Sequence, residues 1–94
     1  MEMDNTFIKK IWLVTQESNV DGEITFNAAP CISEEIAKKV MEQKKNTILT
    51  ESNHYKKHNK DDFKIEDDDV HFFIQDLYDD YYEYITIEVK QIQY

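Results

Sequence analysis

Residues 11–28 read IWLVTQESNVDGEITFNA, and this stretch decides the fold. Its first half is mostly apolar or β-branched, which is typical of a strand. Its end alternates, placing Ile24, Phe26 and Ala28 on one face of a second strand. Between the two strands stands Gly22, the only glycine of the chain, where a hairpin turn needs a positive φ. The stretch predicts a β-hairpin with the Ile24 and Phe26 side chains in the core.

The residues after this hairpin predict a helix from about Ser33 to about Leu49. Pro30 ends the second strand, and Ser33 has the residue type of an N-cap. Two glutamates follow in the first turn, where the helix dipole favours anions. Apolar residues then recur at helical spacing while lysines face away, and these residues are Ile36, Ala37, Val40, Met41 and Ile48.

A second hairpin is predicted in the C-terminal third. Residues 51–62 are polar and aperiodic, which indicates an exposed connection, and residues 63–65 add a short edge strand. Apolar residues alternate over residues 70–74 and again over residues 82–92, on either side of a turn at residues 76–80.

The order ββαββ predicts an α+β fold, in which one antiparallel sheet of four or five strands carries a single helix on one face. A length of 94 residues indicates one acidic domain over residues 1–94. The other sheet face, with Tyr82, Tyr84 and Phe73, is expected to be partly open and serves as a binding surface, a homodimer interface or a plain exterior. The expected core is Ile11, Leu13, Ile24, Phe26, Ile36, Val40, Met41, Phe72, Ile85 and Ile87.

The composition favours a reducing compartment. No apolar run approaches the ~20 residues of a membrane span, and the N-terminal residues lack the basic and apolar regions of a signal peptide. Cys31 is the only cysteine, so it has no partner within the chain for a disulfide. The expected location is the cytoplasm, with no membrane partner.

The net charge of −9 is concentrated in one region. Residues 61–88 hold eleven acids against Lys64 alone, a local balance of −10. Every basic residue is lysine, whereas arginine is the usual residue for bidentate contacts to phosphates and bases. Direct binding to nucleic acid is therefore not expected, and the expected partner is a basic protein surface.

The first turn is compared with a calcium-binding EF-hand loop. Glu17, Asn19 and Asp21 take loop positions one, three and five, and Gly22 takes position six. Position twelve, which should be a bidentate glutamate, is Ala28. The hairpin-turn interpretation is therefore preferred over calcium binding.

Other reactive residue types are interpreted as structural. His54 and His58 are four residues apart, a spacing suited to zinc on a helix, but no third ligand lies nearby in sequence, and His71 falls on a strand. Cys31 and Ser33 precede the helix and fit a corner and a cap better than nucleophiles. The sequence predicts no catalytic residue, no bound metal and no cofactor, so the protein is not expected to be an enzyme.

Carboxylates and aromatic rings are interleaved in the second hairpin. Tyrosines anchor protein interfaces, and carboxylates along a strand or loop have separations of the same order as those of phosphates in nucleic acid. The predicted function is therefore a non-enzymatic interaction module whose partner is a basic, nucleic-acid-binding protein. The predicted partner-binding residues are Asp76, Tyr78, Asp79, Asp80, Tyr82, Glu83 and Tyr84.

The alternative function is a divalent-cation-binding module that uses the same carboxylates. The acidic run at residues 66–69 and the loop at residues 76–80 would form such a site if the strand pairing brought them together. A small metabolic enzyme is the third and lowest-ranked hypothesis, because no nucleophile or acid–base pair stands out.

Residues 14–23, VTQESNVDGE, carry a resemblance. They resemble a loose group of small uncharacterised bacterial and phage proteins, in which a hydrophobic strand continues as V-T-x-E-S-x-x-D-G-E and a helix leads to an acidic, Tyr-rich strand pair. The resemblance implies a context of bacteria and their mobile elements, and no site residue carries over from it. By analogy of size and charge, it implies a phage-type inhibitor of a host nuclease.

Overall fold

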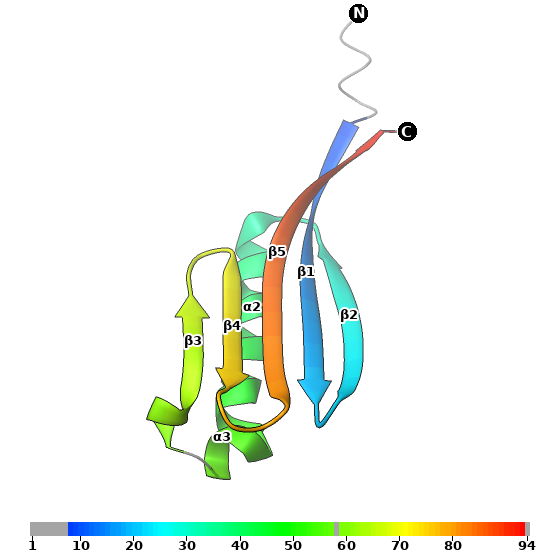
Figure 1. Cartoon of the computed structure of the whole chain (residues 1–94). Helices are drawn as coiled ribbons and strands as arrows, with labels where there is room; N and C mark the ends of the chain where they lie inside the picture. The colour runs from blue at the N-terminus through cyan, green and yellow to red at the C-terminus, as the bar shows by residue number, and fades with distance from the viewer. Residues whose placement is uncertain (1–7, 58, 94) are drawn as a thin grey trace, which may run out of the picture.

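The computed structural model describes residues 8–57 and 59–93. In this part of the chain, five antiparallel strands form one sheet, and the long helix lies across one face of it (Figure 1). The predicted α+β fold, two hairpins separated by a helix, is confirmed. The helical elements are α2 (Glu34–Glu51), α3 (Asn53–Lys57) and the single 3-10 turn η1 (Lys60–Asp62). The strands are β1 (Ile8–Val20), β2 (Glu23–Cys31), β3 (Phe63–Asp67), β4 (His71–Asp76) and β5 (Tyr81–Gln93).

The strand order is β2-β1-β5-β4-β3, so β5 lies in the middle of the sheet. It pairs with β1 along thirteen residues, from Ile8 opposite Gln93 to Val20 opposite Tyr81. Because Val20 and Tyr81 are the residues next to the turns, the β1–β2 and β4–β5 turns lie side by side at one end of the sheet (Figure 1).

Helix α2 begins as predicted, because the Ser33 side chain accepts a hydrogen bond from the Ile36 N–H at 3.2 Å. It ends at Glu51, two residues later than predicted, because the extended backbone of the next residue, Ser52, breaks the helix. The Ser52 hydroxyl then accepts a hydrogen bond from the Tyr55 N–H at 3.2 Å, which starts α3. The predicted connection at residues 51–62 is exposed or half-buried in its described part, but it is more regular than expected, since it carries both α3 and η1.

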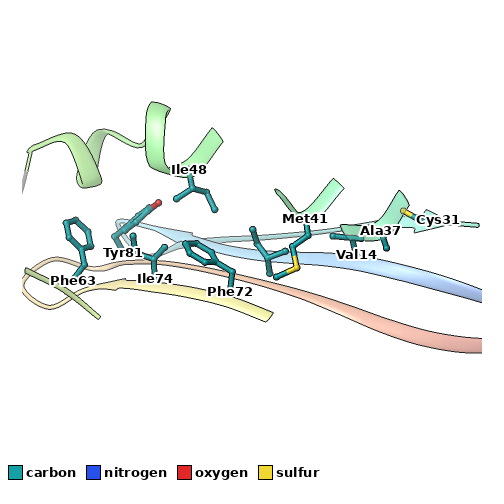
Figure 2. Close-up of a cluster of buried hydrophobic side chains, with 10 residues drawn as sticks. Val14, Cys31, Ala37, Met41, Ile48, Phe63, Phe72, Ile74 and Tyr81 are labelled. Carbon is teal, nitrogen blue, oxygen red and sulfur yellow. The ribbon is translucent and has the colours of Figure 1, made fainter. Parts of the chain in front are cut away.

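The hydrophobic core lies between α2 and the sheet, as Figure 2 shows. From the sheet, Val14, Phe72, Ile74 and Ile85 are almost completely buried. From the helix, Ala37, Met41 and Ile48 point down onto them, and Val40 packs beside this cluster. Burial of this kind is the main stabilising contribution to the fold.

The predicted core is wrong for β2 and for the start of α2. Ile24 is 62% exposed, Phe26 is 64% exposed and Ile36 is 41% exposed. In the register of β1 with β2, Val14 stands opposite Ala29, so the odd-numbered residues of β2 face the helix and the even-numbered ones face away. Ile24 and Phe26 consequently lie on the face of the sheet opposite α2.

The same register shows that the predicted core positions of Ile11 and Leu13 are also wrong. Leu13 stands opposite Pro30 on β2, so it shares the face of Ile24 and Phe26. This face, opposite α2, is called the open face below. The predicted open-face residues Phe73 and Tyr84 are paired on neighbouring strands of it.

The β1–β2 turn uses two residues with positive φ. Asp21 has φ 54° and Gly22 has φ 89°, the pair of values that a tight hairpin turn needs. The Asn19 carboxamide oxygen accepts a hydrogen bond from the Gly22 N–H at 3.0 Å, and its nitrogen donates to Asp80 Oδ1 at 2.6 Å. The predicted positive φ of Gly22 is confirmed, and the Asn19 side chain closes the turn.

Replacing Gly22 by valine should lower the free energy of unfolding by about 1–3 kcal/mol, because a β-branched residue is strained at positive φ. A Cβ atom at this position would also lie 3.3 Å from Asp80 Oδ2. Gly22→Asn is the control, since asparagine tolerates this backbone conformation. Urea unfolding measures both, and equal losses for valine and asparagine would contradict a conformational cause.

Candidate functional site

The two adjacent turns form one acidic surface, which we call the acidic tip and define as Asp21, Leu77, Tyr78, Asp79 and Asp80. The Asp21 N–H donates to the Asp80 carbonyl oxygen at 2.8 Å, which ties the β1–β2 turn to the β4–β5 turn. Tyr78 is 76% exposed and Leu77 is 55% exposed, and the three aspartates around them are exposed as well. The tip therefore presents two apolar side chains among three carboxylates.

The seven predicted partner-binding residues do not form one surface. Tyr78, Asp79 and Asp80 belong to the acidic tip. Asp76 and Glu83 are buried on the helix side of the sheet, so they are not part of a surface on which another protein could dock. Tyr82 and Tyr84 lie on the open face, because successive residues of β5 point to opposite faces.

Asp76 organises the β4–β5 turn from within. Its side chain is completely buried, and its Oδ1 accepts hydrogen bonds from the N–H groups of Tyr78 at 3.0 Å and Asp79 at 3.2 Å. Its second oxygen, Oδ2, lies 3.6 Å from His54 Nδ1. The carboxylate thus holds the turn with one oxygen and faces a histidine with the other.

The His54 imidazole is placed by α3 between carboxylates of both turns. Its Nδ1 lies 3.8 Å from Asp79 Oδ2 in addition to the contact with Asp76, and its Nε2 lies 3.3 Å from Asp21 Oδ1. The ring stacks on Tyr81, with centroids 4.6 Å apart and an angle of 7° between the planes. His54, Asp76 and Asp79 together form a cluster of metal-ligand type.

Sequence reasoning missed this cluster. It compared His54 with His58, which lies outside the described residues. The carboxylates that face His54 are more than twenty positions away in sequence, and only the packing of α3 beside the turns brings them together. The two acidic runs proposed to meet do not do so, because residues 66–69 and 76–80 lie at opposite ends of the β3–β4 pair.

A buried polar layer adjoins the cluster between α2 and the sheet. Glu83 accepts hydrogen bonds from Gln16 Nε2 at 3.0 Å, from the Tyr81 hydroxyl at 3.0 Å and from the Ser18 hydroxyl. Burial raises the pKa of the Tyr81 hydroxyl, and the neighbouring Glu83 charge adds to the rise. An open cavity of about 940 Å³ runs from this layer to His54, with Lys44 on its helix side.

The open face carries a second group of aromatic and acidic residues. Tyr84 contacts Phe73 and His71 with ring centroids 6.0 and 6.1 Å apart. The Tyr82 hydroxyl donates to Glu17, and this hydrogen bond raises the pKa of Tyr82. Glu66 and then Asp68 raise the pKa of His71, whose Nδ1 lies 2.7 Å from Asp68 Oδ2.

The remaining candidate residues have structural contacts. Cys31 is buried and its thiol donates to the Ala29 carbonyl oxygen at 3.7 Å, while Ser33 caps α2. Among the described helices, none combines the length and apolarity that crossing a membrane requires. No protein-family model, curated protein or solved structure matches this chain.

Proposed function

We propose that the protein is a non-enzymatic interaction module that docks its acidic tip on a basic protein surface. The observation that carries this proposal is the combination of three exposed carboxylates with the exposed side chains of Leu77 and Tyr78. A tyrosine that is 76% exposed on a tight turn is available to a partner without any change in the fold. Tyrosine also loses little conformational entropy when it is immobilised at an interface.

The carboxylates determine which partner fits. Asp21, Asp79 and Asp80 come from two turns that are hydrogen-bonded to each other, so their backbone positions are fixed before binding. Preorganised charges lower the cost of binding and speed the encounter with a surface of opposite sign. A channel that binds nucleic acid is such a surface, so the proposed partner is a basic nucleic-acid-binding protein, of which nucleases are one class.

This proposal predicts that Tyr78→Ala weakens partner binding by at least about tenfold, as the loss of an interface anchor does. Asp80→Lys should weaken binding as well, chiefly by slowing association, and its effect should shrink at high salt. Asp69→Lys is the matched control, because it makes the same charge change in the β3–β4 turn at the opposite end of the sheet.

The measurement is capture of proteins from a bacterial lysate by the immobilised chain and its variants, followed by binding kinetics with the captured protein. Wild type and Asp69→Lys should retain a protein that Tyr78→Ala and Asp80→Lys lose, and duplex DNA should compete with its capture. Circular dichroism checks that the variants are folded. Equal capture by wild type and both tip variants, or capture that nucleic acid does not reduce, would contradict the proposal.

A further inference from the structure

Three potential ligand atoms converge beside the acidic tip. One ring nitrogen of His54 and one carboxylate oxygen each of Asp76 and Asp79 lie within 4.8 Å of one another. They come from α3, from the end of β4 and from the β4–β5 turn. We propose that these three residues form a binding site for a divalent transition-metal cation of the Zn²⁺ class.

The separations suit a single ion. Zinc binds imidazole nitrogen and carboxylate oxygen at ~2.0–2.2 Å, which places the ligand atoms of a tetrahedral site roughly 3.3–3.6 Å apart. His54 Nδ1 already lies 3.6 Å from Asp76 Oδ2 and 3.8 Å from Asp79 Oδ2. The two carboxylate oxygens lie within 4.8 Å of each other, so side-chain adjustment at Asp79, which is half exposed, would complete the set, and solvent would supply the remaining ligands.

The surroundings of the three residues are those of metal ligands. A metal-bound histidine usually donates its other ring N–H to a carboxylate, and His54 Nε2 lies 3.3 Å from Asp21 Oδ1. With an ion bound at Nδ1, the N–H group would be on Nε2, where it faces the Asp21 carboxylate. The ring is further fixed by stacking on Tyr81, and Asp76 by two backbone N–H groups.

The local charge also favours a divalent cation. Three carboxylates surround one imidazole, and the side chain of one of them, Asp76, is completely buried. A divalent cation would bring two positive charges to these carboxylates and would also accept the lone pair of the imidazole nitrogen. A nitrogen ligand favours zinc and related transition metals over Ca²⁺ and Mg²⁺, which prefer oxygen ligands only.

The chain contains a natural control in which the same residue types do not converge. His71 also lies between two carboxylates, but Asp68 faces its Nδ1 at 2.7 Å and Glu66 faces its Nε2 at 3.4 Å. The two ring nitrogens of an imidazole point in different directions, so these carboxylates do not share one ion with a single nitrogen. His71 therefore tests whether a histidine beside two carboxylates is enough to bind a metal ion when the ligand atoms do not converge.

The experiment is a titration of the untagged full chain, freed of metal by a chelator, with Zn²⁺ by calorimetry and with Co²⁺ by visible absorption. We expect one ion to bind at the His54 cluster. His54→Ala and Asp79→Asn should each weaken this binding by at least about tenfold, and Asp21→Asn, which acts only through His54, by about tenfold. His71→Ala and Tyr78→Ala should leave the affinity unchanged, which separates the metal site from docking by the tip.

Asp79 and His54 are not fully buried, so their variants should fold, whereas Asp76→Asn is omitted because Asp76 holds the turn. The His54 ring signals in NMR spectra should shift first when Zn²⁺ is added, before those of His71. Zinc binding of equal strength in wild type and His54→Ala would overturn the proposal. So would the absence of any Co²⁺ absorption band or heat of Zn²⁺ binding in the wild-type chain.

Discussion

Replacing Phe72 by alanine should lower the free energy of unfolding by about 3–5 kcal/mol, the range for a large aromatic side chain removed from a packed core. Phe72 on β4 is 1% exposed, and it lies in the same cluster as Met41 of α2. The Lys45 ammonium lies 5.5 Å from the centroid of the Phe72 ring. It also donates a hydrogen bond to Asp67 at 2.9 Å, so the Lys45 side chain is held against the ring. Alanine would leave a cavity that these neighbours fill only in part.

Phe26→Ala is the matched control for this prediction. It removes the same number of atoms from a strand, but Phe26 lies on the open face and is 64% exposed. Its loss should change the free energy of unfolding by well under half as much. Equilibrium unfolding in urea measures both variants, and a Phe26→Ala effect as large as that of Phe72→Ala would contradict the assignment of the two sheet faces.

Replacing Glu83 by alanine should have the second-largest effect, a loss of about 2–4 kcal/mol. Its carboxylate accepts hydrogen bonds from the side chains of Gln16, Ser18 and Tyr81, all on the helix side of the sheet. Without it, three donors are left beneath α2 with no acceptor of equal strength, and a buried donor without an acceptor costs about 1–3 kcal/mol. Part of this cost is relieved where water enters the adjoining cavity.

Glu88→Ala, on the same strand, is the control for Glu83→Ala. Glu88 lies in the exposed part of β5, at 3.8 Å from Lys90, and surface ion pairs of this kind contribute ~0–1 kcal/mol. Thermal unfolding of both variants at one pH gives the comparison. Similar midpoints for Glu83→Ala and Glu88→Ala would show that the polar layer does not stabilise the fold.

The sequence predicted the elements whose evidence is local. The first turn follows from Gly22 and Asn19, and the start of α2 follows from Ser33, because each of these residues acts on its immediate neighbours. The side of the sheet to which Ile24 and Phe26 point is not a local property. Alternation defines two faces of a strand, but the register with β1 and the position of α2 decide which face is covered.

The candidate sites show the same limit. The exposed residues Tyr78, Asp79 and Asp80 could be selected from the sequence because turn composition indicates exposure. The burial of Asp76 and Glu83 could not be predicted, because in the sequence both residues look like members of a solvated acidic run. The position of His54 opposite Asp76 requires the path of the chain through α3, which the polar composition of residues 51–62 does not indicate.

The central position of β5 has a consequence for the order in which the protein folds. Thr15 and Thr86 share a hydrogen bond across 71 positions, and β5 follows every other strand in the sequence. During synthesis, β1 keeps one edge unpaired until β5 has been made, and the β3–β4 hairpin has no sheet to join before then. Contacts of such long range slow folding to the millisecond-to-second range in small domains. The newborn chain therefore passes through a stage at which an apolar strand edge is exposed, and insertion of β5 ends that stage.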